Sequence, residues 1–283
     1  MVHERFISSS GRLADYLAYR IGFAINESEP VEFALSTVKH AVNNIWDAFG
    51  VKGELFLTGK GNYREYVASI QEYKGNRIQE KPFYYQDIRD YLVNVHKAQV
   101  VTGMEADDIV GIRQYAKTDR STCIVGQDKD LRCIPGHHYD PVKEEYFYMT
   151  LAESNYWFWF QVLTGDRVDN ILGCGKMTDG VYKSGKKIGQ AYTKRKGVGP
   201  EEAKAILDAT DKSWNQMKAA VLNQYGKYYG TNAQSVLHEN ATLIWIQRKE
   251  GINYDGTAIA DSVPSLSEIY GSEENNEEQE QNS

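Results

Sequence analysis

Acidic residues follow three apolar segments of the chain, at the points where those segments end. They are Glu105, Asp107, Asp108, Asp128, Asp130, Asp166 and Asp169. The first three follow residues 98–101, the next two follow residues 123–126, and the last two follow residues 160–165. Like charges repel, so these carboxylates come together only where positive charge offsets the repulsion. Mg²⁺ prefers oxygen ligands, so the pattern predicts a magnesium site, and three unrelated acidic surface turns remain the alternative.

The segments around these acids alternate between helical and extended patterns. Apolar residues indicate helices over residues 30–49, 87–96 and 106–116. Short apolar runs indicate strands over residues 54–58, 99–102 and 122–125. The alternation predicts an α/β fold with a mostly parallel central sheet flanked by helices, whose ligands lie beyond the carboxyl ends of the strands. The first five acids fall at that edge.

The second half of the chain has mainly helical patterns. We expect a strand over residues 144–150 and helices over residues 154–164, 201–209, 212–225 and 233–246. The aromatic run at residues 157–160 is expected in the core rather than at a base-stacking surface. Beyond residue 263 the chain is rich in Ser, Glu, Asn and Gln, a composition typical of disorder.

Charge is unevenly distributed along the chain. The formal net charge is −7, but five glutamates lie in the last twelve residues. Between Cys174 and Lys196 the chain has seven basic residues and one acid, Asp179, interspersed with glycines and tyrosines. This segment predicts a flexible basic loop that approaches a phosphate backbone, with a solvated loop as the alternative. The predicted DNA contacts in it are Lys183, Lys186, Lys187, Lys194 and Arg195.

Membrane insertion and export are not expected. The chain has no run of eighteen apolar residues, and its first ten residues lack the apolar core of a signal peptide, so a cytoplasmic location is predicted. Three cysteines cannot form a complete disulfide set. Cys133 lies near His137 and His138, but a buried thiol is expected there rather than a zinc site.

Residues 197–203 read Gly-Val-Gly-Pro-Glu-Glu-Ala, a Gly-x-Gly turn that opens a helix. Backbone N–H groups of such a turn, here at Gly197 and Gly199, can bind a phosphate without reading a base. Alone the turn also fits an ordinary loop. A second block, Gly-Asp-x-x-Asp-Asn-Ile-x-Gly at residues 165–173, makes the phosphate-binding interpretation more specific.

Four blocks in this order resemble the 5′-nuclease family of flap endonucleases, polymerase 5′-exonuclease domains and phage 5′-exonucleases. The blocks are E-A-D-D at residues 105–108, D-x-D at 128–130, G-D-x-x-D-N-I-x-G at 165–173 and the glycine turn at 197–203. The basic insertion looks closest to the exonucleases of short-tailed lytic coliphages. The resemblance covers about residues 14–210. It implies a PIN/5′-nuclease-like catalytic domain over residues 1–160 with a basic arch over about 62–97, a helix-hairpin-helix region over 161–262, and a tail over 263–283.

The resemblance also implies roles for the site residues. Two Mg²⁺ ions, with Mn²⁺ able to substitute, would generate hydroxide and stabilise the leaving 3′-oxygen. Glu105, Asp107 and Asp128 would lie near the attacking water, and Asp108, Asp130, Asp166 and Asp169 would support the second ion. In the arch, Lys74 and Arg77 would neutralise charge in the transition state, and Tyr73 would stack on a base.

Two positions depart from the family pattern. Leu13 and Gly59 stand where relatives carry aspartates, so Asp15 is a candidate surrogate ligand.

The predicted function is a metal-dependent 5′→3′ DNA exonuclease with flap and RNA-primer activity, which acts on duplex 5′ ends, nicks, flaps and RNA–DNA hybrids and leaves 5′-phosphates. A catalytically impaired DNA-binding protein of the same fold and a PIN-like ribonuclease are the alternatives. No partner is predicted for the acidic tail.

Overall fold

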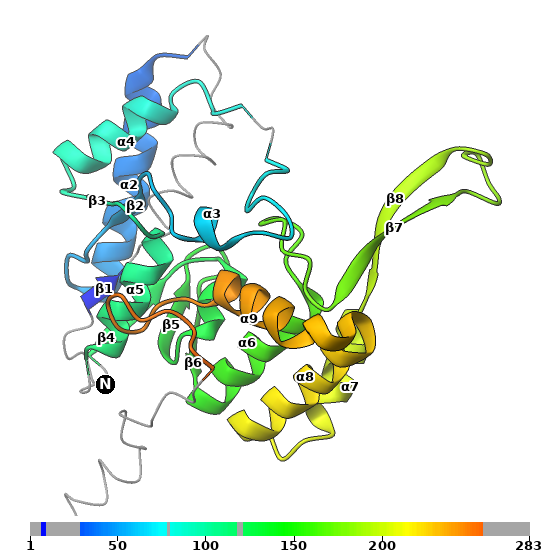
Figure 1. The fold of residues 1–283 in the computed structure, drawn as a ribbon. Helices are drawn as coiled ribbons and strands as arrows, with labels where there is room; N and C mark the ends of the chain where they lie inside the picture. The colour runs from blue at the N-terminus through cyan, green and yellow to red at the C-terminus, as the bar shows by residue number, and fades with distance from the viewer. Residues whose placement is uncertain (1–6, 10–28, 78–79, 118–120, 257–283) are drawn as a thin grey trace, which may run out of the picture.

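The main sheet has four strands in the order β1-β4-β5-β6 (Figure 1). The computed structural model describes residues 7–9, 29–77, 80–117 and 121–256. The four strands are β1 (Ile7–Ser9), β4 (Thr122–Val125), β5 (Gly136–Asp140) and β6 (Glu145–Met149). The first three are parallel, and β6 is antiparallel to β5. All four residues of β4 are buried, as expected for a strand covered on both faces.

A second, two-stranded parallel ladder joins β2 (Phe56–Thr58) to β3 (Gln99–Val101). The predicted mostly parallel α/β architecture is therefore confirmed, although the pairing divides into two ladders. The carboxyl ends of β3 and β4 lead into the segments that contain the first five acids.

Three helices pack around these strands, and they match the predicted segments closely. They are α2 (Val31–Phe49), α4 (Tyr85–Asn94) and α5 (Ala106–Tyr115). The buried stripe of α2 consists of Ala34, Val38, Val42 and Ile45. It packs with buried residues of α4, including Ile88 and Leu92. Residues 85–94, at the end of the segment predicted as the arch, therefore pack into the core.

The C-terminal half is helical, as predicted. It contains α6 (Leu151–Thr164), α7 (Pro200–Asp208), α8 (Trp214–Tyr229) and α9 (Ala233–Ile244), with the short 3-10 helix η2 (Gly230–Asn232) between α8 and α9. Two further short helices, α3 (Arg64–Val67) and η1 (Lys129–Cys133), lie earlier in the chain. Phe158 and Trp159 of α6 are fully buried, as expected of core aromatics. One hydrophobic cluster extends from Phe56 to Tyr254, so the predicted boundary at residue 160 falls inside α6 and inside a shared core.

The basic segment is not a loop but an antiparallel hairpin that projects from the body (Figure 1). Its strands are β7 (Gly175–Val181) and β8 (Ala191–Gly197). The prediction of a flexible loop is therefore wrong. Interspersed lysines and glycines hid the strand pattern, and seven cross-strand residue pairs define the ladder.

In the described part of the chain, no helix has the length and apolar character that a membrane span requires.

Candidate functional site

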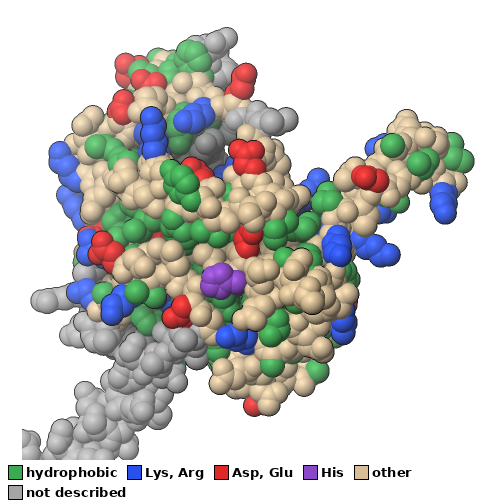
Figure 2. All heavy atoms as spheres, viewed as in Figure 1, with side chains coloured by type: hydrophobic (Ala, Val, Ile, Leu, Met, Phe, Trp, Pro, Cys, Tyr) green, Lys and Arg blue, Asp and Glu red, His purple; other side chains and the backbone are tan. Residues whose placement is uncertain are grey.

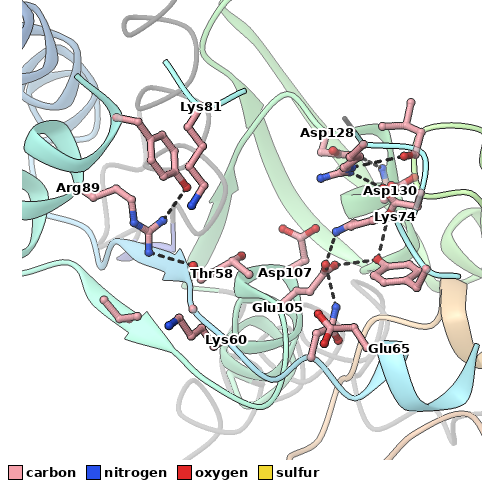
Figure 3. A pocket seen from close by; sticks show the side chains of 18 of the residues that line it. Thr58, Lys60, Glu65, Lys74, Lys81, Arg89, Glu105, Asp107, Asp128 and Asp130 are labelled. Carbon is pink, nitrogen blue, oxygen red and sulfur yellow. Dashed lines mark hydrogen bonds and ion pairs between the residues drawn. The ribbon is translucent and has the colours of Figure 1, made fainter. Parts of the chain in front are cut away.

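Six of the seven predicted acids line one cavity of about 1540 Å³ between the two strand ladders and the segment before α4 (Figure 3). They are Glu105, Asp107, Asp128, Asp130, Asp166 and Asp169. A smaller cavity of about 20 Å³ lies beside it and touches all of these except Asp128. That volume suffices for about one water molecule. The carboxylates predicted from three separate segments therefore meet at one place.

Helix caps and turns orient three of these carboxylates, those of Glu105, Asp128 and Asp166. Glu105 is the N-cap of α5 and forms a capping box with Asp108. Asp128 is the N-cap of η1, where its carboxylate accepts a hydrogen bond from the backbone N–H of Asp130 at 2.8 Å. The Asp166 carboxylate accepts from the backbone N–H groups of Val168 at 2.7 Å and of Asp169 at 3.1 Å. Acidic residues suit these positions because carboxylates satisfy the unpaired N–H groups at helix starts and turns.

Three cationic side chains lie among the acids. Lys74 forms ion pairs with Glu105 and, at 3.7 Å, with Asp169. Arg77 contacts Asp169 at 2.5 Å. Lys129 contacts Asp130 at 2.7 Å and also pairs with Asp166.

The cations offset the cost of gathering the acids. Burial opposes ionisation of Asp166, but the hydrogen bond and charge of Lys129, together with the backbone N–H groups of Asp169 and Val168, hold the pKa of Asp166 below its ordinary value. Lys74 and Arg77, predicted to neutralise charge on the phosphate, lie beside the acids, and that role stays a prediction. Lys129 was not singled out from the sequence, although its place between Asp128 and Asp130 is a usable signal.

Tyr73 is buried, with 6% of its surface exposed, and does not present a ring for stacking. Its hydroxyl hydrogen-bonds to Asp169 at 2.9 Å and to Glu105 at 3.2 Å. Burial raises the pKa of Tyr73 well above its ordinary value, and the two nearby carboxylates raise it further. The predicted base-stacking role is corrected: the hydroxyl remains protonated and bridges acids from α5 and the segment after α6.

Asp108 is the one predicted metal ligand that does not face the cavity. It is fully buried, and the Arg64 guanidinium donates to both of its oxygens, at 2.7 and 2.9 Å. The backbone N–H groups of Glu105 and Gln247 also donate to it, at 3.0 and 2.9 Å. With both oxygens occupied, Asp108 positions its neighbours rather than binding a metal, which corrects the prediction. No sequence pattern identified Arg64 as its partner.

The hairpin has two different faces. Residues directly opposite each other in an antiparallel ladder point to the same side. Lys176 pairs with Lys196 and Thr178 with Lys194, so these three lysines share one face, which we call the lysine face. Tyr192 lies on the same face, with the Lys194 ammonium 4.5 Å from its ring centroid. Figure 2 shows basic side chains along the projecting hairpin.

Arg195 lies on the other face and holds the hairpin base. Its guanidinium donates to the carbonyl oxygens of Leu172 at 2.6 Å, Val198 at 3.1 Å, and Leu163 and Cys174 at 3.2 Å. This corrects its prediction as a DNA contact. The other predicted contacts remain exposed, with Lys194 on the lysine face and Lys183, Lys186 and Lys187 in the turn between the strands.

The glycine turn opens α7, as predicted, with Gly199 as the N-cap and Pro200 at the first position. A Cβ at Gly199 would meet no atom within 4 Å, so the backbone there is open to approach. A Cβ at Gly197 would lie 2.4 Å from the Cys174 carbonyl oxygen. Gly197 is therefore required for close strand pairing at the hairpin base, whereas Gly199 remains a candidate phosphate contact.

The two departures from the family pattern differ in what the structure reveals. Leu13 and Asp15 lie outside the described residues. Gly59 lies at the cavity wall, where a Cβ would come within 2.5 Å of the Val101 carbonyl oxygen. The Gly59 N–H donates to that same oxygen at 2.7 Å, so β2 and β3 are too close for an aspartate at this position.

The residues fit a divalent metal by their chemistry and convergence. Among the described residues, no three histidine, cysteine, aspartate or glutamate side chains can hold one ion as they stand. Lys74 and Lys129 lie between the acids, as the ion pairs above describe. Lys129 is 52% exposed, so its long side chain can withdraw toward solvent when a cation of higher charge takes its place. An all-oxygen donor set is the kind that Mg²⁺ and Mn²⁺ prefer.

The chain has the PIN-like 5′-exonuclease fold. The structure of T5 5′-exonuclease with bound divalent zinc ions aligns with a TM-score of 0.58 at 14% identity, over 85% of this chain and 89% of that chain. T5 D15 protein co-crystallized with metal ions aligns with a TM-score of 0.54 at 14% identity, over 82% and 86%. No protein-family model and no curated protein matches the sequence. The resemblance to 5′-nucleases is therefore confirmed at the level of the fold.

Proposed function

We propose that the chain is a metal-dependent 5′→3′ DNA exonuclease. The observation that carries this is the convergence of six carboxylates from three segments on one cavity, together with three cations suited to a phosphate. The fold supports the proposal, because the solved structures that share it are described as a 5′-exonuclease with metal ions.

Glu105, Asp107 and Asp128 would hold one divalent ion, and Asp130, Asp166 and Asp169 the second. A pair of such ions supplies an activated water and stabilises the departing oxygen of an in-line displacement. The protein positions these ligands by the helix caps and turns described above. Tyr73 fixes the separation between Glu105 and Asp169 by bridging them.

Lys74 and Arg77 would bind the scissile phosphate. Both line the cavity and pair with its carboxylates, and Arg77 is 44% exposed. With the acids engaged as metal ligands, Lys74 and Arg77 would be available to an anionic ligand. Their guanidinium and ammonium groups would then stabilise the charge that develops on the phosphate oxygens.

The lysine face and the lysines of the hairpin turn would bind the duplex beside the cleaved strand. Phosphate contacts carry no sequence information, so binding would be structure-specific and independent of sequence. We propose duplex 5′ ends, nicks, 5′-flaps and RNA–DNA hybrids as substrates, with 5′-phosphate products.

The direct test is digestion of DNA labelled at the 5′ end, presented as duplex, nicked and flapped molecules. Cleavage from the 5′ end is expected with Mg²⁺ or Mn²⁺ and none with EDTA. Labelled RNA and forked DNA in the same assay distinguish this activity from a PIN-like ribonuclease. Cleavage of RNA alone would reject the proposal.

A second candidate function is structure-specific DNA binding without cleavage. The observation that favours it is Gly59, where the backbone leaves no room for a carboxylate. In that case the flapped and nicked molecules would bind in Mg²⁺ and remain intact.

A further inference from the structure

The large cavity has a basic end opposite its acidic end. Figure 3 shows Lys81 and Arg89 on the side away from Asp128 and Asp130, with Lys60 below them. Lys60, Lys81 and Arg89 all line the cavity. Among the described residues, neither Lys60 nor Lys81 has an acidic partner, so their charges are not explained by ion pairs within the fold.

The basic end is organised around Tyr85 of α4. The Arg89 guanidinium donates to the Thr58 carbonyl oxygen at 2.9 Å and to the Tyr85 hydroxyl at 3.3 Å. These bonds fix Arg89 between α4 and the end of β2. The Lys81 ammonium lies 5.0 Å from the Tyr85 ring centroid, and Arg89 lies 5.5 Å from it. Two cations are thus held over one aromatic ring.

Lys60 completes this end from the turn after β2. It directly follows Gly59, the position at which a side chain has no room. Its backbone is fixed, because the Lys60 carbonyl accepts from the Gly103 N–H at 3.0 Å. The turn that leads from β2 therefore presents a base to the cavity instead of an acid.

We propose that this basic end binds the terminal 5′-phosphate of a DNA strand whose scissile bond lies at the acidic end. Lys60, Lys81 and Arg89 would contact the phosphate. Val93 and Val100, which also line the cavity, would contact the sugar or base of the first nucleotide. Charged hydrogen bonds to a phosphate are strong, and the planar guanidinium of Arg can donate two of them to a pair of phosphate oxygens. The proposal rests on the proposed function only for the strand's polarity.

Asp90 does not oppose this assignment. It also lines the cavity, but its carboxylate accepts a hydrogen bond from the Gln86 amide at 2.8 Å. Asp90 lies at the solvent-facing side of α4, so solvent screens its charge. Glu65 also lines the cavity but lies nearer Glu105 (Figure 3), so the three cations outnumber Asp90 at the basic end.

Fluorescence anisotropy in EDTA tests the proposal without requiring cleavage. The probes are one recessed duplex with a 5′-phosphate, the same duplex with a 5′-hydroxyl, and a 5′-flap with a 5′-hydroxyl. Wild-type protein is expected to bind the phosphorylated end about tenfold more tightly than the hydroxyl end. Lys60→Ala with Lys81→Ala should remove that preference and leave binding of the hydroxyl end unchanged.

Arg89→Lys keeps a charge but loses the bonds to β2, so it should reduce the preference in part. A matched control, Lys183→Ala with Lys186→Ala in the hairpin turn, should weaken both ends equally. Equal affinity of wild-type protein for the two ends would overturn the proposal, as would an unchanged preference in the Lys60/Lys81 variant. Loss of binding to the hydroxyl flap in that variant would assign the site to internal phosphodiesters and reject the terminal one.

These outcomes separate the two proposals. A preference for the phosphorylated end in EDTA, without cleavage of DNA in Mg²⁺, would support the 5′-phosphate site and reject the nuclease function. Equal cleavage rates and equal affinities for the two ends would support the nuclease function and reject the 5′-phosphate site.

Discussion

Arg64 and Asp108 form a fully buried, bidentate ion pair, with nitrogen–oxygen distances of 2.7 and 2.9 Å. The same guanidinium donates to the Leu243 carbonyl oxygen at 2.9 Å and to that of Trp245. It therefore ties the start of α5, which supplies Glu105 and Asp107, to the end of α9. Burial of Arg64 opposes its charge, but Asp108 more than compensates and raises its pKa well above the ordinary value.

Breaking this pair should destabilise the fold. Arg64→Met leaves the Asp108 charge buried without its partner, and such changes cost about 3–5 kcal/mol. Urea unfolding of Arg64→Met, Asp108→Leu and the double variant measures the effect. We expect the double variant to recover part of the loss. Additive losses in the double variant would show that the two side chains do not interact.

Removing a cavity acid should abolish cleavage while DNA binding persists. Asp107→Ala would remove a metal ligand, whereas most of the affinity for DNA comes from phosphate contacts elsewhere. Cleavage rate and anisotropy on the same flapped DNA measure the two effects. Asp90→Ala, which alters an acid at the other end of the same cavity, is the control and should cut normally. Full activity of Asp107→Ala would reject the metal site.

The two hairpin faces should contribute differently to DNA binding. Neutralising one lysine that binds a phosphate of duplex DNA reduces the slope of log affinity against log salt by about 0.9. Lys176→Ala, Lys194→Ala and Lys196→Ala together should therefore flatten the salt dependence. Met177→Ala with Thr193→Ala changes the opposite face and should leave the slope unchanged. Equal slopes for the unchanged protein and both variants would mean that the hairpin does not contact the phosphate backbone of the DNA.

Stability should depend on pH through His138. Burial lowers the pKa of His138 from 6.5 to about 4, although its hydrogen bond to the Ile134 carbonyl oxygen opposes the shift. Between these values the unfolded chain binds a proton that the folded chain excludes, so stability falls as the pH falls. The loss below pH 4 is on the order of 3 kcal/mol. The urea midpoint of His138→Gln should change less between pH 7.5 and pH 5 than that of the unchanged protein. An equal change in the two proteins would show that His138 is not the source of the pH dependence.

Introducing a carboxylate at residue 59 should not increase the proposed nuclease activity. Gly59→Asp places a Cβ against the Val101 carbonyl oxygen, so β2 and β3 must separate. We expect a lower melting temperature and no increase in cleavage at any Mg²⁺ concentration. Gly61→Ala, at a glycine with φ +79° whose Cβ would meet only a distant backbone atom, separates backbone strain from steric conflict. Faster cleavage by Gly59→Asp than by the unchanged protein would show that the strands can adjust.

The sequence predicted what local periodicity encodes. The apolar stripe of α2 and the acids after β3 and β4 follow from spacing alone, so they were found at nearly the correct residues. β5 was missed because Gly136–Asp140, Gly-His-His-Tyr-Asp, has no apolar run, and its pairing with β4 and β6 defines it. The burial of Tyr73 and Arg64 was missed because their partners lie more than thirty residues away along the chain.

The two ends of the hairpin meet where it leaves the body. The Val198 N–H donates to the Cys174 carbonyl oxygen at 2.9 Å, and Gly175 and Gly197 face each other with no room for a Cβ. The polypeptide thus returns to its starting point after an excursion of more than twenty residues. A change in the length of the hairpin therefore leaves the two points where it joins the body unchanged. If the hairpin binds DNA as proposed, its length and charge can be altered by mutation without moving the carboxylates of the cavity.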